Sequence, residues 1–361
     1  MLCGFPAFNR QESDCGGRYG GGMSDISDAN GMNRRDDMGS RDCVNCMCGK
    51  GDRDSKDSRN RSNVSPDDRQ VSAEPRISGQ HAPTGSKLVF IDIDGTLADE
   101  HHHVPQSAVD ACRQAQRNGH LLFICTGRSL MKIEQSILDL GFDGVVSVAG
   151  ARADINGRTL FEHLISPEAI DAATAYFREH DIRNYQWQGP DGMYVSRGYM
   201  QYLQAKGSAW KDPQFASRWH VIEELDTHGQ SLGASIRASK GSYFADRGNP
   251  TSFEDTCKAL SRWFSAVPGT YGKISDNHGE LLIPGVDKGT AVEQVARTLG
   301  YSISDTIALG DGGNDMAMIL AAGTSVAMGN GIEEIKQAAD MVTDSVEDDG
   351  FAHAFSRLGL I

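Results

Sequence analysis

Four short segments of the chain carry side chains that could do chemistry together. The first, DIDGT from Asp92, places two acids at i and i+2 before a glycine that permits a tight turn. The second is TGR from Thr126, the third is Lys288 at the start of a helical pattern, and the fourth is GDGGND from Gly310. Each segment alone has an ordinary structural explanation as a turn, a helix cap or a surface lysine. Their combination indicates a functional site.

The chemistry that these segments predict is the binding of a metal ion and a phosphoryl group. We expect the acids to converge at one edge of a sheet, where they are Asp92, Asp94, Asp311 and Asp315. Two like charges 4 Å apart repel by about 4 kcal/mol at an effective dielectric constant near 20. A divalent cation relieves this repulsion, and oxygen ligands suit Mg²⁺. With Lys288 and Thr126 alongside, the predicted site can bind phosphate.

The elements that must position these residues begin at about residue 86, where short apolar runs alternate with helical patterns. This alternation predicts a parallel sheet with covering helices. We predict strands over residues 87–94, 120–127, 144–150, 305–311 and 324–329, and helices over 108–119, 129–141, 288–300, 315–323 and 333–339. The chemical segments follow these strands or begin these helices, and open parallel sheets place their ligand crevice at the carboxyl ends of the strands.

The remaining chain divides by composition. Residues 166–284 contain aromatic and mixed polar segments and are predicted to form an inserted α+β domain. This insertion divides the predicted core into two parts of the sequence, residues 86–165 and residues 285–361. Residues 1–85 are rich in Gly, Ser, Asp, Arg and Asn and are predicted to be a disordered tail. This tail contains five of the eight cysteines, and its CVNCMC segment could belong to a zinc or iron–sulfur site. Unligated cysteines are the favoured interpretation, because no second ligand pair follows.

The charge balance excludes some classes of partner. The formal net charge of -14 argues against general electrostatic binding of the chain to nucleic acid or anionic lipid. No apolar run approaches the roughly 18 to 20 residues of a membrane span. No signal peptide is visible at the start, so we expect a cytoplasmic protein. The oligomeric state is not predicted.

The ordered set of motifs strongly resembles the haloacid dehalogenase (HAD) superfamily of aspartate-nucleophile phosphotransferases. The motifs of that superfamily are DxDGT, a hydrophobic strand ending in Ser or Thr, a lone Lys and GDxxND, and here they read IDIDGTL, LLFICTGR, VDKGTA and LGDGGNDM. The large insertion follows the second motif. This position of the insertion is similar to that in the Cof-type (IIB) sugar-phosphatase-like branch. The resemblance covers residues 86–361 and implies a Rossmann-like, doubly wound core with an α+β cap of the C2B type.

The resemblance also implies a reaction and its residues. Asp92 would be the nucleophile that forms an aspartyl-phosphate, and Asp94 would be the general acid and then the general base. The implied Mg²⁺ site comprises Asp92, the backbone carbonyl of Asp94, Asp311 and Asp315. The implied phosphate ligands are Thr126, the backbone at Ile93 and Gly127, Asn314 and Lys288. The expected activity is Mg²⁺-dependent hydrolysis of small phosphate monoesters, such as a sugar phosphate, a nucleotide or a cofactor phosphate.

Two alternatives and two local details stay open. A phosphomutase or phosphotransferase could use the same aspartate, and a non-catalytic binding protein could keep the fold. Phosphatase is favoured, because basic residues in the insertion are scattered and all four motifs are present. Arg128 is either an anion contact or a helix-start residue that pairs with a carboxylate. The branch often has Asn-Gly-Ala after the third strand, whereas this chain has Ala149-Gly150-Ala151, which puts substrate contacts in doubt.

Overall fold

A computed structural model describes residues 85–190, 192–207, 218–225, 227–269, 275 and 277–361. All of them belong to one unit of the chain, residues 71–361. The predicted tail, with its five cysteines, lies outside the described residues apart from Gly85. Two sheets organise the described part of the chain, one of eight strands and one of six.

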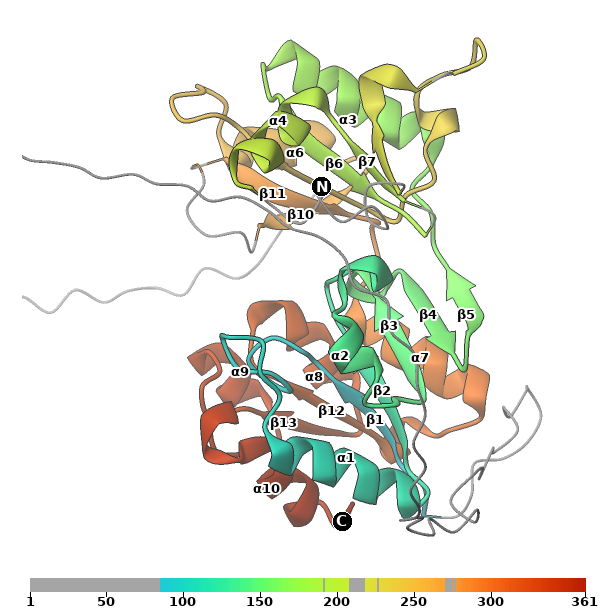
Figure 1. Ribbon diagram of the computed structural model, residues 1–361, viewed down its shortest axis with the longest axis vertical. Helices are drawn as coiled ribbons and strands as arrows, with labels where there is room; N and C mark the ends of the chain where they lie inside the picture. Colours follow the sequence, from blue (N-terminus) through green and yellow to red (C-terminus); the bar gives the residue numbers. More distant parts are fainter. Residues whose placement is uncertain (1–84, 191, 208–217, 226, 270–274, 276) are drawn as a thin grey trace, which may run out of the picture. The chain divides into compact units, whose positions relative to one another are not determined.

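The eight-stranded sheet has the order β14-β13-β12-β1-β2-β3-β4-β5 (Figure 1). Its first six members are parallel, whereas β4 and β5 pair antiparallel at one edge. The strands are β1 (Leu88–Ile91), β2 (Leu121–Cys125), β3 (Gly144–Ser147), β4 (Arg152–Ile155), β5 (Arg158–Glu162), β12 (Thr306–Gly310), β13 (Thr324–Ala327) and β14 (Met341–Val342). In chain order the parallel strands run outward from β1 in one direction and from β12 in the other. This is the doubly wound arrangement, with its switch point between β1 and β12.

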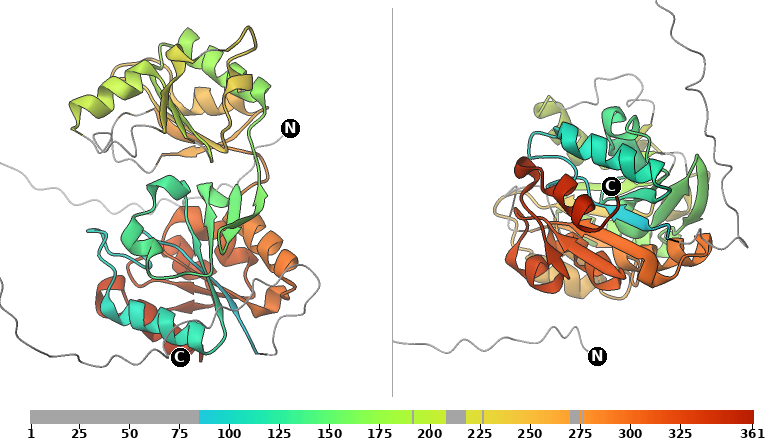
Figure 2. Two further views of the ribbon diagram at one scale, coloured as in Figure 1. Left: turned by 45° about the vertical axis from the view of Figure 1, so that its right-hand side comes forward. Right: turned by 90° about the horizontal axis from the view of Figure 1, so that it is seen from below.

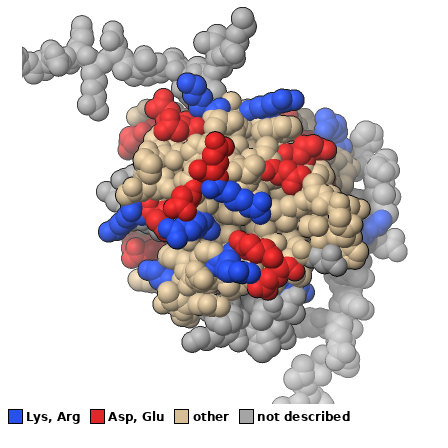
Figure 3. Space-filling model, turned by 90° about the horizontal axis from the view of Figure 1, so that it is seen from above, with Lys and Arg blue, Asp and Glu red and all other residues tan. Residues whose placement is uncertain are grey.

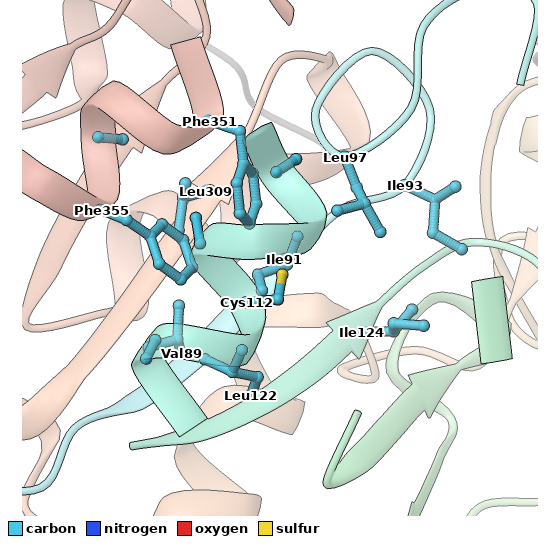
Figure 4. Packing of buried hydrophobic residues seen from close by; sticks show 14 of the residues in the cluster. Val89, Ile91, Ile93, Leu97, Cys112, Leu122, Ile124, Leu309, Phe351 and Phe355 are labelled. Carbon is cyan, nitrogen blue, oxygen red and sulfur yellow. The ribbon is translucent and has the colours of Figure 1, made fainter. Parts of the chain in front are cut away.

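Helices cover both faces of this sheet, because the strands are apolar on both faces. Val89 and Ile91 of β1 pack with α1 (Gln106–Arg117) and α10 (Gly350–Arg357), which lie side by side in Figures 1 and 2. Figure 4 shows Phe351 and Phe355 of α10 in this cluster. The alternate residues of β1 pack on the opposite face with α7 (Lys288–Leu299), α8 (Met316–Ala321) and α9 (Glu333–Ala338). The predicted doubly wound α/β core is confirmed.

The six-stranded sheet has the order β10-β11-β9-β6-β7-β8, and only the β7–β8 pair is parallel. Its strands are β6 (Asn184–Gln188), β7 (Met193–Val195), β8 (Trp219–Val221), β9 (Lys240–Phe244), β10 (Ser265–Pro268) and β11 (His278–Leu282). One face is apolar and packs with α3 (Pro167–Glu179) and α6 (Phe253–Leu260), while α4 (Arg197–Ala205) follows β7. We call this part the six-stranded module.

Local structure differs from the prediction at two places in the core. The helix predicted over 129–141 is broken into a 3-10 turn, Leu130–Lys132, and the four-residue α2, Gln135–Leu138. The break follows from Ile133 and Glu134, whose backbones are extended while the Ile133 side chain joins the core. The β4–β5 hairpin was not predicted, because its short strands lack a continuous apolar run.

Further 3-10 turns connect these elements. They are Val148–Gly150, Ile222–Glu224, Gly233–Ser235, Ile303–Asp305, Gly313–Asp315 and Val346–Asp348. In the part of the chain that the structure describes, no helix has the length and apolar character needed to cross a membrane.

Candidate active site

A buried lysine joins two acids at the switch point of the core sheet. Asp92 follows β1, and its backbone N–H donates to the carbonyl of Leu309 in the adjacent strand β12 at 3.1 Å. The Lys288 ammonium donates to Asp92 Oδ1 at 2.6 Å and to Asp315 Oδ1 at 2.5 Å. Asp92 is 3 % exposed, Lys288 is 1 % exposed and Asp315 is 0 % exposed. They form a charged cluster that is almost completely removed from water.

Lys288 occupies the first position of α7, where a cation opposes the helix dipole. The helix is instead capped by Asp287, whose side chain accepts the N–H of Thr290 at 2.8 Å in a reciprocal capping box. The attraction of Asp92 and Asp315 for the Lys288 ammonium offsets its unfavourable interaction with the helix dipole. Local helix chemistry therefore fixes where α7 begins, and the acids hold its first side chain.

A third carboxylate completes a set of oxygen ligands. Asp92, Asp311 and Asp315 each offer an oxygen atom, and these atoms lie within 4.8 Å of one another. Asp315 Oδ2 accepts the backbone N–H groups of Asp311 at 3.1 Å and Gly312 at 3.0 Å, which fixes its orientation. Hard divalent cations prefer such oxygen-only donors, and the three acids exceed the single lysine in charge. The donor set therefore fits Mg²⁺.

Gly95 allows the Asp311 carboxylate to approach the loop after β1. Its φ of +82° lies in the left-handed region that favours glycine, and an added Cβ would overlap the Asp311 side chain. The Thr96 hydroxyl lies 3.4 Å from Asp311 Oδ1. The glycine of the DIDGT segment thus provides both the turn and the space for a carboxylate from the neighbouring strand.

Burial and like charge make the acids of this cluster hard to ionise when no cation is present. Burial raises the pKa of Asp92 to about 8, and the Asp315 carboxylate adds to this rise, whereas Lys288 opposes it. Burial also raises the pKa of Asp311 to about 6, again with a contribution from Asp315. The pKa of Lys288 is raised, because the attraction of Asp315 and Asp92 outweighs its burial. A bound cation would favour the ionised carboxylates.

These raised pKa values predict how the stability of the metal-free protein depends on pH. A carboxyl with a higher pKa in the folded chain than in the unfolded chain stabilises the fold at low pH, and this contribution is lost as the pH rises through the folded value. We therefore expect the free energy of unfolding in chelator to fall between about pH 4 and pH 8, by up to about 1.4 kcal/mol per pH unit for Asp92 over this whole range and for Asp311 only up to about pH 6. Urea unfolding of the wild type and of Asp92→Asn measures this. Equal pH dependence of the two proteins in chelator would contradict it.

Asp94 lies apart from the carboxylate cluster. Its carboxylate forms a two-pronged ion pair with Arg128, in which Nε donates to Oδ2 at 3.0 Å and Nη2 to Oδ1. Arg128 also pairs with Glu134, and it contacts His102 Nδ1 at 3.1 Å. Of the two alternatives for Arg128, the structure shows the pairing with a carboxylate. The Asp94 carboxylate remains half exposed, with a relative side-chain exposure of 52 %.

The turn after β2 presents a hydroxyl and a free backbone N–H. Thr126 is 1 % exposed, and its Oγ1 accepts the N–H of Arg128 at 3.2 Å. Within the described residues, the N–H groups of Ile93 and Gly127 donate to no protein acceptor. Unpaired N–H groups next to buried acids and a lysine are suited to an anionic ligand. Asn314 lies in the 3-10 turn Gly313–Asp315, where it is exposed.

The turn after β3 is strained and holds the Thr126 turn in place. Val148, Ala149 and Gly150 have φ values of +54°, +55° and +100°. The N–H of Val148 donates to the carbonyl of Arg128 at 2.8 Å, and the N–H of Ala149 donates to that of Thr126 at 3.1 Å. Left-handed backbone is unfavourable for valine and alanine but is tolerated by Asn. The residue usual at position 149 in the resembled branch therefore suits this backbone better than Ala149 does.

Ala149→Asn is therefore expected to stabilise the protein. Relief of the left-handed penalty should raise the free energy of unfolding by about 0.5 to 1 kcal/mol, because Asn adopts this region more readily than Ala. Urea unfolding measures the change. Ala169→Asn, at a buried position of α3, serves as the control and should destabilise. A loss of stability at position 149 would show that the Ala149 backbone is not under strain.

A cavity of about 690 Å³ lies beside the segment that follows the Thr126 turn, and its lining begins at Ser129 and does not include Thr126 or the carboxylate cluster. Its lining combines apolar side chains such as Leu130 and Met131 with charged side chains such as Arg152 and Glu162. Ser129 and Ser147 also line it, and their hydroxyls are buried without a hydrogen-bond partner among the described residues. A cavity of this size accommodates a small organic molecule, and the two hydroxyls could bind polar groups on it.

Comparison with known proteins identifies the family. A model of the haloacid dehalogenase-like hydrolases matches residues 89–355. The phosphatase YwpJ of Bacillus subtilis is 30 % identical over 75 % of this chain and 99 % of its own length. The 5-amino-6-(5-phospho-D-ribitylamino)uracil phosphatase YcsE of the same organism is 25 % identical over 77 % of this chain and 98 % of its own. A hypothetical protein from Geobacillus kaustophilus has a TM-score of 0.63 at 27 % identity, covering 77 % of this chain and 100 % of its own.

The chain therefore belongs to the haloacid dehalogenase-like hydrolases, an enzyme family that includes phosphatases. The predicted superfamily is confirmed. Sequence reasoning did not identify Glu134, Ser129 or Ser147 as parts of the site. Glu134 could have been found only by recognising that the segment after Arg128 is not a continuous helix, and isolated serines carry no motif.

Proposed function

We propose that this protein is a Mg²⁺-dependent phosphatase that hydrolyses small phosphate monoesters through an aspartyl-phosphate. The observation that carries this proposal is the buried cluster of Asp92, Asp311, Asp315 and Lys288 next to unpaired N–H groups at the switch point of the core sheet. The carboxylates suit a cation and the N–H groups suit phosphoryl oxygens. Phosphoryl transfer is catalysed mainly by such positioning and charge neutralisation.

In this proposal Asp92 attacks phosphorus, and the bond from phosphorus to the leaving oxygen breaks as the aspartyl-phosphate forms. Lys288, the Thr126 hydroxyl, Asn314 and the N–H groups of Ile93 and Gly127 bind the phosphoryl oxygens. The Thr126 hydroxyl is oriented for this role, because Oγ1 already accepts the N–H of Arg128 and its own proton is left to donate. Water then hydrolyses the acyl phosphate and returns Asp92.

Asp94 is proposed to move the protons. It would protonate the leaving alcohol and then deprotonate the attacking water. The exposed fraction of the side chain supports this role, because it leaves the carboxylate accessible to a substrate.

Mg²⁺ would be held by Asp92, Asp311, Asp315 and the backbone carbonyl of Asp94. When bound, it would neutralise charge on the phosphoryl group and on the clustered acids. The excess of three acids over one lysine, and the raised pKa values of Asp92 and Asp311, support the presence of such a cation.

We propose that residues 166–284 act as a cap over a core formed by residues 86–165 and 285–361, and that the leaving group extends into the cavity lined by Ser129 and Ser147. All strands of the six-stranded module lie between Asn184 and Leu282, which supports this division. The mixed apolar and hydroxyl lining suits a sugar, nucleoside or cofactor, and the ribitylaminouracil substrate named for the YcsE relative belongs to this size class.

Small molecules are the proposed partners. Figure 3 shows basic and acidic side chains interspersed on the face in view, without an extended patch of one sign. Such a face does not favour a nucleic acid polymer. We also propose a cytoplasmic location, which is supported by the buried free thiols of Cys112 and Cys125.

Phosphate release from a panel of sugar phosphates, nucleotides, cofactor phosphates and a phosphopeptide tests this function. We expect release from the small monoesters with Mg²⁺, none in chelator, and little from the phosphopeptide. Absence of release from every compound would overturn the proposal, and conversion of a sugar phosphate to its positional isomer would identify a phosphomutase instead.

A further inference from the structure

The six-stranded module has a buried polar patch on the face opposite its apolar core. Its members share one face of adjacent strands and are Gln186, Gln188, Lys240, Ser242 and Glu280, all at most 8 % exposed. Gln186 Oε1 has no hydrogen-bond partner among the described residues. Buried polar side chains are costly unless they are bonded or serve a ligand. Gln186 Nε2 donates to Ser242 Oγ at 2.8 Å, so the buried charges of Lys240 and Glu280 are the part of the patch that calls for a functional explanation.

Lys240 connects this patch to the phosphate-binding turn. Its ammonium is 2.7 Å from Glu280 Oε1 and donates to the carbonyl oxygen of Gly127 at 3.1 Å. Glu280 lies opposite Ser242, so Lys240 is its diagonal neighbour on the same face. Glu280 also attracts Lys132, whose pKa burial lowers to about 8. The ion pair with Glu280 therefore holds the Lys240 side chain against the turn.

The contact with Gly127 acts on the peptide group that orients Thr126. The carbonyl of Gly127 and the N–H of Arg128 belong to the same planar peptide. One end of this peptide accepts from Lys240 and the other donates to Thr126 Oγ1 at 3.2 Å. Rotation of the peptide would move both bonds together. Without the lysine, the Gly127–Arg128 peptide would be free to rotate, and the Thr126 hydroxyl would lose its fixed hydrogen-bond partner.

We propose that Lys240, held by Glu280, is a positioning residue that fixes the Gly127–Arg128 peptide and so aligns Thr126 for the phosphoryl group. This role rests on the proposed function, because it assumes that Thr126 binds phosphate. It assigns to the insertion a contribution to catalysis besides enclosure of the leaving group. The side chain acts through the turn and does not touch the reacting atoms.

The double variant Lys240→Met/Glu280→Gln tests this role, because it removes the Lys240–Glu280 pair as a unit, and Glu280→Gln alone controls for the loss of the attraction between Glu280 and Lys132. With p-nitrophenyl phosphate and Mg²⁺ we expect kcat to fall about 10- to 100-fold, since small misplacements of catalytic groups have effects of this size, while KM changes less. Inorganic phosphate should bind about 10-fold more weakly. Lys240→Arg, which can keep both contacts, should retain most of kcat.

Glu254→Gln/Lys258→Met, an exposed pair on α6 of the same module, is the matched control and should behave as wild type. Wild-type kcat and phosphate affinity in the Lys240→Met/Glu280→Gln variant would overturn the proposal. The proposal would also be overturned if the loss of kcat paralleled the loss of melting temperature in every variant, because the effect would then be one on stability. If the wild type hydrolyses no phosphate ester, the proposed function fails, and phosphate affinity alone then decides the role of Lys240.

Discussion

Asp92→Asn is expected to reduce phosphate release by at least about 1000-fold, the order of loss seen when a catalytic nucleophile is removed. An amide cannot form the acyl phosphate, and binding groups elsewhere in the site cannot replace that step. The fold should persist, because Lys288 keeps Asp315 as a buried partner. The measurement is phosphate release on the best substrate of the panel, with circular dichroism to verify folding.

Asp110→Asn is the matched control, because Asp110 is an exposed acid on α1 and should be replaceable without loss of activity. The wild type should also yield a phosphorylated protein after acid quenching, and Asp92→Asn should not. Retention of a tenth or more of the wild-type activity in Asp92→Asn would exclude Asp92 as the nucleophile.

Lys288→Met should affect both stability and activity. It leaves Asp92 and Asp315 buried without their shared cation, and removal of one partner from a buried ion pair costs about 3 to 5 kcal/mol. We expect a loss of this order in the metal-free protein near pH 8, partly restored by Mg²⁺. Phosphate release should fall by about 100-fold or more, because a donor to the phosphoryl oxygens is lost.

Urea unfolding with and without Mg²⁺ measures the effect on stability, and Lys258→Met on the exposed side of α6 controls for loss of a lysine. A change below about 1 kcal/mol in the metal-free protein would mean that the acids are protonated or solvated rather than paired with Lys288.

The sequence predicted the elements whose signals are local. The apolar runs of β1, β2 and β12 and the helical pattern of α7 lie next to the chemical motifs, so the core and its superfamily could be predicted together. The pairing of Arg128 with Glu134 could not, because it depends on the extended backbone at Glu134, which the helical pattern of the segment conceals.

The six-stranded module was predictable only as an α+β region. Its strand order depends on pairings between β6, β9 and β11, which are far apart in the sequence. The contact of Lys240 with Gly127 is equally remote, and an isolated lysine at the start of a strand carries no signal of its own. The burial of that lysine became evident only from the pairing of its strand with its neighbours.

The central place of β1 also determines when the core can form during synthesis on the ribosome. β1 is apolar and lies between β2 and β12, with Leu88 opposite Thr306. Until the chain has been made as far as Thr306, one side of β1 has no partner strand and remains an open edge, which favours association with other chains. The six-stranded module, by contrast, comes from one continuous segment and can fold earlier. Nascent chains of this protein should therefore expose this edge of β1 until β12 has been synthesised.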